Sequence, residues 1–133
     1  MIENFGDMVA HSSDIEIDVR TRYLPDQSVP GEKRYVFAYT ITISNNGDED
    51  VQLVHRHWQI TDANNKVHEV NGRGVVGETP LIAAGESFQY TSGTLLETEV
   101  GSMQGSYDMV SASGTAFSAL IHPFSLALPG VVH

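Results

Sequence analysis

The fold of this chain of 133 residues is decided by the stretch Tyr35-Val36-Phe37-Ala38-Tyr39-Thr40-Ile41-Thr42-Ile43-Ser44-Asn45, within a pattern that runs from Lys33 to Asn45. Large apolar side chains occupy every second position, and smaller or polar side chains lie between them. A period of two is typical of a strand that buries one face in a hydrophobic core. The residues that follow, Asn46-Gly47-Asp48, favour turns, so the strand is predicted to end there.

Six further stretches have a strand pattern, at about residues 14–24, 51–61, 66–70, 87–96, 105–111 and 117–126. Turn-forming residues separate them, and no stretch has a convincing helical period. Seven short antiparallel strands predict an all-β fold, a two-sheet antiparallel β-sandwich of immunoglobulin or fibronectin type III type. An open barrel is the alternative. We expect one domain over residues 1–133, with an ordered core at about 14–128 and a loose N-terminus at 1–12.

The charge balance is strongly acidic, with 7 Lys and Arg against 17 Asp and Glu and a net charge of −10 at pH 7. Such a chain is not expected to coat nucleic acid non-specifically, because neutralising phosphates requires clustered Lys and Arg, although a local anion site stays open. The absence of Cys excludes thiolate metal sites and a Cys nucleophile and fits the reducing cytoplasm. No apolar run approaches the ~20 residues that span a bilayer. We therefore expect a cytoplasmic location and no membrane insertion.

The most recognisable short motif is Gly72-Arg73-Gly74-Val75-Val76-Gly77, which matches the dinucleotide-binding pattern G-x-G-x-x-G. That pattern binds a pyrophosphate where a strand leads into a helix, and here Pro80 and Gly85 leave no room for a helix. We therefore interpret the motif first as a packing loop whose two valines enter the core. The alternative is an anion or nucleotide site built from backbone N–H groups, in which Arg73 and Arg56 accompany Gly72, Gly74 and Gly77.

A strand with two different faces is predicted over Leu53-Val54-His55-Arg56-His57-Trp58-Gln59-Ile60. Trp58, the only Trp of the chain, is predicted to face the core. Strict alternation places Arg56 on the same face, where an unpaired guanidinium is too costly to keep. We expect Arg56 either at the rim of the sandwich or in an ion pair that pins the glycine loop, with Glu69 or Glu78 as the partner. An Arg exposed at the loop mouth, where it binds an anion or a carboxylate of another protein, is the alternative.

The opposite face of this strand is predicted to carry His55 and His57, together with Leu53 and Gln59. Two His residues two positions apart on a strand are able to hold one metal ion, and imidazole suits cobalt, nickel or zinc better than magnesium. A third ligand has to come from a neighbouring strand, and His68 and Glu69 are the candidates. An outer sheet face with two partly exposed imidazoles is the main interpretation, and a metal site is the alternative.

Catalysis has little support in this sequence. No G-x-S-x-G nucleophile elbow is present, and the carboxylates are spread out, as in the turn Asp48-Glu49-Asp50. We therefore expect no enzyme activity, no catalytic residue and no cofactor. Tyr107 is expected to have a structural role, as the packed tyrosine that sandwich domains often place at a corner.

The last predicted strand is interrupted by His122-Pro123-Phe124. Because proline cannot donate a hydrogen bond to a sheet, this strand is predicted to be bulged or to lie at an edge. An edge strand offers a pairing surface to another chain. This feature predicts a protein partner or a homodimer.

Four segments, taken in order along the chain, resemble the ApaG family, which is also called CorD. They are His55-Arg56-His57-Trp58 with Ile60-Thr61-Asp62-Ala63-Asn64; Val70 with Gly72-Arg73-Gly74-Val75-Val76-Gly77-Glu78-Thr79-Pro80; Gly85 with Phe88-Gln89-Tyr90-Thr91-Ser92-Gly93; and Gly101-Ser102-Met103-Gln104-Gly105-Ser106-Tyr107-Asp108-Met109. The similarity runs from about residue 14 to about residue 128, which is nearly the whole chain. Four motifs in register are far more specific than the glycine motif alone.

The resemblance implies a fibronectin type III-like sandwich in a bacterial cytoplasmic protein, in a pathway linked to cobalt and magnesium homeostasis or to diadenosine tetraphosphate metabolism. It also implies protein binding, since eukaryotic relatives attach this domain to F-box proteins and to a polymerase-interacting protein. Family proposals of nucleotide or pyrophosphate binding would fall on Gly72, Gly74 and Gly77, near Arg73. Residues and resemblance together predict a non-catalytic protein-binding module. Nucleotide binding through residues 72–77 and metal binding through His55 and His57 are the alternatives.

Overall fold

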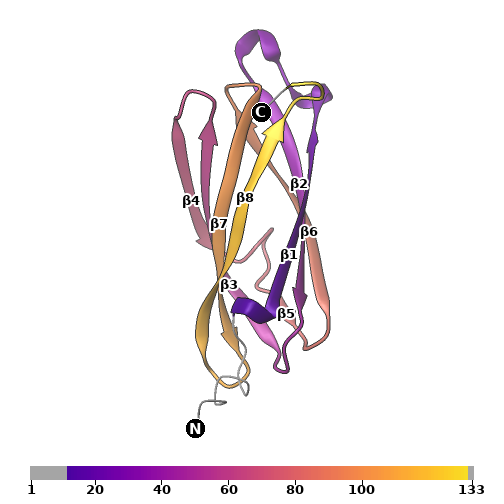
Figure 1. Ribbon diagram of the computed structural model, residues 1–133, viewed down its shortest axis with the longest axis vertical. Helices are drawn as coiled ribbons and strands as arrows, with labels where there is room; N and C mark the ends of the chain where they lie inside the picture. Colours follow the sequence, from indigo (N-terminus) through magenta and orange to yellow (C-terminus); the bar gives the residue numbers. More distant parts are fainter. Residues whose placement is uncertain (1–11, 132–133) are drawn as a thin grey trace.

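The computed structural model describes residues 12–131, which form eight β-strands and three short 3₁₀ turns (Figure 1). The strands are β1 (Ile15–Tyr23), β2 (Tyr35–Asn45), β3 (Val51–Asp62), β4 (Val67–Arg73), β5 (Leu81–Ile82), β6 (Ser87–Leu96), β7 (Val100–Ser111) and β8 (Ala116–Ala127). The 3₁₀ turns are η2 (Ser12–Asp14), η3 (Pro25–Gln27) and η4 (Pro30–Glu32). Within residues 12–131, no helix has the length and apolar character needed to cross a bilayer. Apart from Ser12, the predicted loose N-terminus lies outside the described residues.

The strands form two antiparallel sheets that pack face to face (Figure 1). One sheet has the order β1-β2-β6, and the other has the order β4-β3-β7-β8 with the short β5 also paired to β3. The predicted two-sheet sandwich of fibronectin type III type is therefore confirmed, and the open barrel is not formed. The eighth strand, β5, was not predicted, because two residues are too short to show a period.

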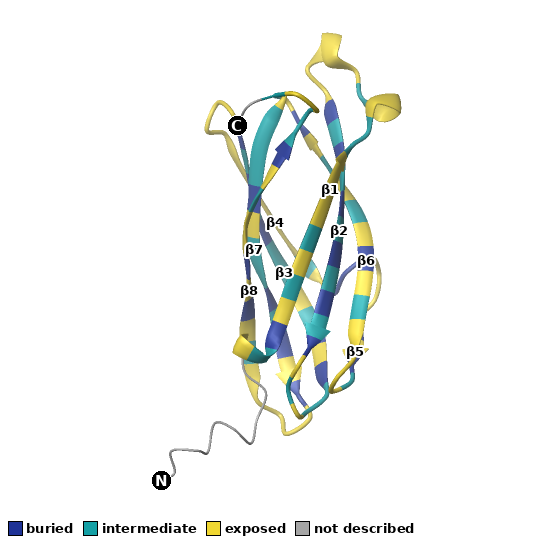
Figure 2. Cartoon of the chain, turned by 45° about the vertical axis from the view of Figure 1, so that its right-hand side comes forward, coloured by how far each residue is buried: buried dark blue, intermediate teal, exposed yellow. Residues whose placement is uncertain are grey.

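The alternation in β2 determines where the core lies. Phe37, Tyr39, Ile41 and Ile43 are buried, and the side chains between them are half-buried. β2 is the middle strand of its sheet, with β1 on one side and β6 on the other. In Figure 2 the buried segments line the space between the sheets, while exposed segments follow one another along β1 and β6.

A β-bulge at Val54 corrects the predicted faces of β3. The pairing of β3 with β7 shifts register between Leu53 and His55, so Val54 is an extra residue on β3. One extra residue reverses the alternation for all residues beyond it. Leu53 is therefore fully buried on the same side as Trp58, whereas the prediction had placed Leu53 on the outer face with the two histidines.

Two strand boundaries also differ from the sequence prediction. β4 continues to Arg73, so Gly72 and Arg73 belong to a strand and not to a loop. β7 begins at Val100, earlier than the predicted residue 105. Gly101 and Gly105 of this strand allow close approach of β3: a Cβ atom at Gly101 would lie 2.6 Å from the carbonyl oxygen of Thr61, and one at Gly105 would lie 1.9 Å from that of His57.

The predicted irregularity of the last strand is confirmed. β8 is an edge of the five-stranded sheet. Its pairing with β7 shifts register between Ile121 and Phe124, so His122 and Pro123 together face the single residue Gln104. The bulge leaves Pro123 where no ladder hydrogen bond is required of it.

Candidate functional site

The glycine motif forms the end of β4 and a tight hairpin turn behind it. Val75 and Glu78 exchange two backbone hydrogen bonds of 2.8 and 2.9 Å. Between them, Val76 and Gly77 have positive φ angles of 41° and 83°, which is typical of a two-residue type I′ turn. The prediction that both valines enter the core is correct for Val75, which is fully buried, and wrong for Val76, which is exposed at the tip.

Arg56 holds this turn in place through backbone carbonyl groups. Its Nη1 donates hydrogen bonds to the carbonyl oxygens of Arg73 and Gly74, at 3.1 and 2.9 Å. Gly72 lies opposite Arg56 in the pairing of β3 with β4, and a Cβ atom at Gly72 would lie 2.7 Å from Arg56 Nη2. The glycine therefore makes room for the guanidinium to lie across β4.

The expected ion pair of Arg56 with Glu69 or Glu78 is thus replaced by hydrogen bonds to carbonyl oxygens. Two lone pairs on each carbonyl make it a sufficient acceptor for a half-buried guanidinium. The sequence correctly placed Arg56 on the core side and correctly gave it the task of pinning the loop. The sequence does not predict the acceptors of these hydrogen bonds, because every residue has a backbone carbonyl group and none is distinguished by its residue type.

Most polar groups of the glycine segment are used within the fold. The N–H of Gly74 donates to the carbonyl oxygen of Val54 at 2.7 Å, and a Cβ atom at Gly74 would lie 2.0 Å from the carbonyl oxygen of Glu78. A depression of about 240 Å³ next to the turn is lined by Arg73, Gly77, Glu78 and Thr79. An anion placed there would meet the carboxylate of Glu78 as well as the cation of Arg73, which is unfavourable for a polyphosphate.

The inner side of Arg56 meets a group of buried tyrosines. Burial raises the pKa of the hydroxyls of Tyr39, Tyr90 and Tyr107, and the nearby charge of Arg56 offsets part of that rise. The hydroxyls of Tyr90 and Tyr107 are hydrogen-bonded to each other and so join the two sheets. Trp58 faces the core, as predicted, and packs at ring-centroid distances of 5.4 Å from Tyr39 and 6.3 Å from Tyr107. Tyr107 and Trp58 are therefore core residues.

On the outer face of the five-stranded sheet, four polar side chains form a row across β4, β3, β7 and β8. His57 Nδ1 lies 2.7 Å from Asn71 Oδ1, and His57 Nε2 lies 2.9 Å from Asp108 Oδ2. Ser118 Oγ donates a hydrogen bond of 3.1 Å to Asp108 Oδ1. Because an amide oxygen and a carboxylate both accept, this arrangement requires both imidazole nitrogens to donate and favours the cationic ring.

The row shifts the pKa values of its two titratable members in opposite directions. The hydrogen bond to Asp108, assisted by that to Asn71, raises the pKa of His57. The same hydrogen bond to His57 lowers the pKa of Asp108. The two side chains are still 41% and 44% exposed, so their ion pair contributes little to stability.

The same row does not have the arrangement of a nucleophilic triad. In a triad the imidazole stands between the hydroxyl and the carboxylate and takes the proton of the hydroxyl. Here the carboxylate of Asp108 stands in the middle, with Ser118 on one side and His57 on the other. Ser118 therefore donates to a carboxylate and lacks the adjacent imidazole that takes the proton in a triad.

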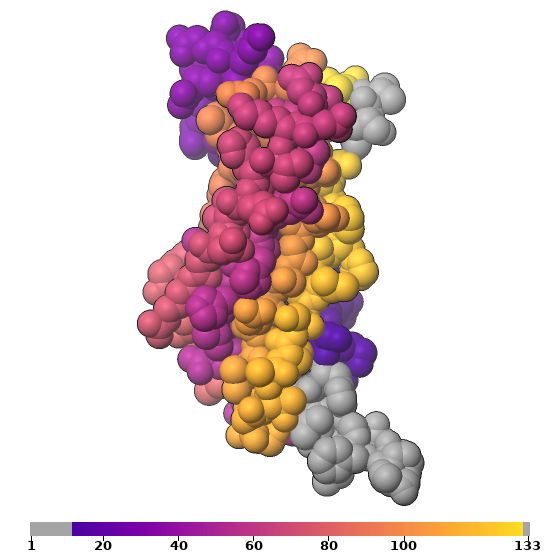
Figure 3. All heavy atoms as spheres, turned by 90° about the vertical axis from the view of Figure 1, so that its left-hand side faces the viewer, coloured from indigo at the N-terminus to yellow at the C-terminus, as the bar shows by residue number. Residues whose placement is uncertain are grey.

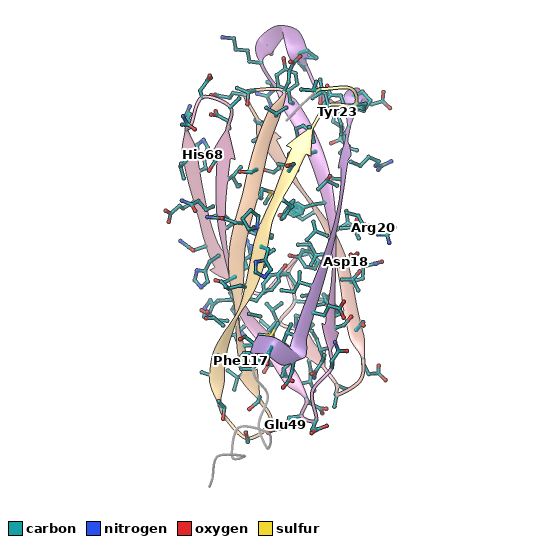
Figure 4. The ribbon with its side chains drawn as sticks, in the orientation of Figure 1. Asp18, Arg20, Tyr23, Glu49, His68 and Phe117 are labelled. Carbon is teal, nitrogen blue, oxygen red and sulfur yellow. The ribbon has the colours of Figure 1, made fainter. Side chains whose placement is uncertain are left out.

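The candidate metal ligands are divided between two faces. His55 and His57 share the outer face, and Glu69 lies on it opposite Gln59. His68 pairs with Ile60, one position out of phase with Glu69, near the far end of β4 (Figure 4). Across residues 12–131, the structure places no group of three or more His, Asp or Glu side chains so that it could hold a metal ion.

A shallow hollow of about 380 Å³ lies beside the polar row. Figure 3 views the side of the molecule on which β4, β7 and β8 are seen together. The hollow is lined by residues of β3, β4, β7 and β8, among them Gln59, Glu69, Asn71, Gln104, Leu120 and Pro123. Gln104 Nε2 donates to Gln59 Oε1 at 2.7 Å, and Leu120 is 66% exposed. The bulge at His122 and Pro123 forms one wall.

Sequence reasoning found His57 in this region but missed Asn71, Asp108 and Leu120. These residues meet because β3 pairs with β4 and β7, and β7 pairs with β8. Alternation in each strand assigns them to an outward face, and this was the available signal. The order of strands in the sheet, which brings the faces together, cannot be read from alternation.

The family follows from comparison with known proteins. The family model described as the ApaG domain matches residues 25–111. The chain belongs to the ApaG family. Protein ApaG of Pseudomonas fluorescens strain Pf0-1 is 54% identical over 119 residues, covering 90% of this chain and 94% of the relative. Protein ApaG of Shewanella sp. strain MR-4 is 53% identical over 126 residues, covering 95% of this chain and 100% of the relative.

Solved structures agree with this ApaG-family assignment. A structural-genomics target solved by X-ray crystallography has a TM-score of 0.87 and 52% identity, covering 92% of each chain. A crystal structure described as an ApaA protein from Bordetella pertussis has a TM-score of 0.86 and 47% identity, covering 89% of this chain and 96% of that one. The resemblance found in the four sequence motifs is confirmed.

Proposed function

We propose that this ApaG-family chain is a non-catalytic binding module that engages a protein partner through the outer face of its five-stranded sheet. The observation that carries the proposal is Leu120, which is 66% exposed beside a hollow with a polar rim. An apolar contact surrounded by hydrogen-bonding groups is the usual anatomy of a protein–protein interface.

The rim has the chemistry to bind polypeptide. Gln59, Asn71 and Gln104 carry amide groups, which match the donors and acceptors of a peptide backbone. Glu69 adds a carboxylate, and His57 adds an imidazole whose pKa is raised by its hydrogen bond to Asp108. The groups with reactive potential, His57, Asp108 and Ser118, are bonded to one another, so binding is favoured over turnover.

The partner is expected in divalent-cation homeostasis or in diadenosine tetraphosphate metabolism, the pathways that the family resemblance implies. Nucleotide binding at residues 72–77 stays an alternative prediction, with the depression beside Arg73 in its favour and Glu78 and the net charge of −10 against it. Metal binding by His55 and His57 also stays a prediction, but His57 would first have to give up Asn71 and Asp108.

The proposal is tested by site-specific photocrosslinking in bacterial cells. A photoreactive amino acid replaces Leu120 in the full chain, and a matched chain carries it at Leu81 of β5, which is 67% exposed. We expect a discrete adduct with one other protein from position 120 and none from position 81. Substitution Gln104→Ala, at the rim, should reduce the yield of that adduct.

Equal crosslinking from both positions, or no adduct with another protein from position 120, would contradict the proposal. Circular dichroism of each purified chain is the folding control. Both leucines are exposed to the same degree, so a difference between them reports the surface and not the exposure of the probe.

A further inference from the structure

The free edge of the three-stranded sheet carries charges in a particular order. On β1, Glu16 and Asp18 occupy the first half of the outward face, and Arg20 and Arg22 occupy the second half. Asp18 and Arg20 project away from the sandwich (Figure 4), with side-chain exposures of 62% and 84% and an N–O distance of 3.5 Å. β2 and β6 contain no charged residue. Every charged residue of this sheet's strands therefore lies on β1, one of its two edge strands.

These charges have no ionic partner on the neighbouring strand. β2 places only uncharged side chains opposite them, in the order Ser44, Thr42, Thr40 and Ala38. The exposed contact between Asp18 and Arg20 is a weak surface pair. Charges on an edge strand usually deter pairing with other chains, and a run of one sign would serve that purpose. The order negative, negative, positive, positive does not deter pairing with a second copy. When the second strand runs antiparallel, each negative charge lies opposite a positive one.

We propose that β1 pairs antiparallel with β1 of a second copy of this chain, about a two-fold axis at Val19. Antiparallel pairing reverses the partner, so Asp18 lies opposite Arg20 of the partner subunit and Glu16 lies opposite Arg22 of the partner subunit. Two-fold symmetry repeats each of these ion pairs. Opposite charges directly across two antiparallel strands attract.

The register of this pairing is fixed by the same four charges. A slip of two residues in one direction places Asp18 opposite Asp18 of the partner subunit, and a slip in the other direction places Arg20 opposite Arg20 of the partner subunit. Like charges directly opposite each other are destabilising. A slip of one residue would exchange the charged and apolar faces. The register about Val19 is therefore the one in which each of the four charges faces an opposite charge.

The inner face of β1 gives a second reason for the pairing. Ile17, Val19 and Tyr23 pack against the core but are only partly buried. A groove of about 600 Å³ runs between β1 and β8, lined on its apolar side by Ile17, Val19, Ile121 and Phe124. A partner strand beside β1 would extend the sheet over this groove, where Val19 meets Val19 of the partner subunit. The interface would then bury apolar side chains on one face and ion pairs on the other.

β1 is also regular enough to accept a partner. It pairs with β2 over nine consecutive residues with no shift of register, and it contains neither Gly nor Pro. The edge strand of the other sheet on this side, β8, is interrupted by the bulge at His122 and Pro123. β1 is thus the continuous edge of this side of the molecule (Figure 1).

The test is the association state of the full chain, measured by sedimentation equilibrium. We expect a concentration-dependent dimer for the wild type. Asp18→Arg places two cations opposite each other at two symmetric positions, and Arg20→Asp does the same with anions, so each should raise the dissociation constant about tenfold or more. The double variant Asp18→Arg with Arg20→Asp restores complementarity and should restore the dimer. An equal mixture of the two single variants should form mixed dimers.

A matched control carries the same charge change elsewhere. Asp26→Arg, on the exposed turn η3, should leave the dissociation constant unchanged. The chain has no Cys, so a cysteine at the two-fold axis reports the register directly. Val19→Cys should yield a disulfide-linked dimer on mild oxidation, because the two Cβ atoms face each other at about 5 Å. Thr21→Cys, on the same face, should not, because it faces Ile17 of the partner subunit.

A wild-type chain that stays monomeric at all concentrations would overturn the proposal. So would a dimer that is indifferent to both charge reversals, since it would use another surface. A double variant that fails to dimerise while keeping the wild-type circular dichroism spectrum would show that charge order is not what selects the partner. Leu120 also lines the groove between β1 and β8, so a photocrosslink from position 120 to a second copy of this chain would report the dimer, whereas an adduct with another protein would report the proposed function.

Discussion

At the residue scale, the glycines of the Gly72 to Gly77 motif have unequal tasks. We expect Gly77→Ala to cost about 1 kcal/mol, because only its positive φ is strained and its surroundings are open. Gly72→Ala should cost about 1–3 kcal/mol, because the guanidinium of Arg56 must move off two carbonyl oxygens. Gly74→Ala should cost most, since a backbone carbonyl 2.0 Å away cannot move aside. Urea unfolding of the three variants measures the order.

A double-mutant cycle separates the steric role of Gly72 from any ligand role. In an Arg56→Leu background the Gly72→Ala change should lose most of its cost, because the group it collides with has gone. Equal costs at all three glycines, with no coupling to Arg56, would contradict this explanation. The residues alone placed Arg56 on the correct side of β3. They could not show Gly72 beneath it, because that contact depends on the register between β3 and β4.

At the scale of the strands, the row across β4, β3, β7 and β8 makes a pH prediction. Asp108→Asn should lower the pKa of His57 toward its ordinary value of 6.5, because the main cause of its elevation is removed. Ser118→Ala is the control, since Ser118 contacts Asp108 and not the imidazole. NMR titration of the imidazole measures both. An unchanged pKa in Asp108→Asn would refute the hydrogen bond as the cause.

The same pair sets the pH window of its contribution to stability. The pKa of His57 is raised on folding, so its contribution is full below pH 6.5 and is lost as pH rises through the folded-state pKa. The pKa of Asp108 is lowered on folding, so its contribution is present above pH 3.8 and is lost as pH falls through the folded-state pKa. The pair therefore stabilises the fold in mildly acidic conditions, by a small amount given its exposure.

The strands themselves were the most predictable level of this molecule. A period of two located seven of them, because a strand that buries one face between two sheets needs apolar side chains at every second position. It failed at β5, which is two residues long, and at Val54, where one extra residue changes the face of Leu53. It also stopped short of Gly72 and Gly101, because a glycine has no side chain that could extend the alternation, and here each glycine marks a close approach between strands.

At the scale of the whole molecule, the net charge of −10 predicts two opposite effects of salt. Screening should relieve self-repulsion and stabilise the monomeric Asp18→Arg variant by about 1 kcal/mol. The midpoint of its thermal unfolding should then rise by roughly 4 °C. The same screening should weaken the ion pairs across β1 and lower dimer affinity in the wild type. Thermal unfolding and sedimentation, each with and without salt, measure the two effects. A lower midpoint in salt would contradict the self-repulsion argument.

The architecture was predictable at this scale, while the candidate sites were not. Strand number and spacing suffice for a two-sheet sandwich. The outer-face hollow draws Gln59, Asn71, Gln104 and Leu120 from four strands, and their adjacency exists only once the strand order is known. The charge order of β1 is visible in the sequence. It indicates a pairing surface only once β1 is known to be an edge strand whose neighbour, β2, is uncharged.

Because Val54 is an extra residue in β3, the number of residues in this strand determines which side chains face the core. Removing that one residue would turn half of the strand inside out, bringing Leu53 into solvent or the outer-face histidines into the core. Removing two residues would shorten the strand and leave every remaining side chain on its own side. Insertions or deletions of two residues within β3 should therefore be tolerated better than those of one residue. Whether the length of this segment is odd or even should matter more in evolution than its composition.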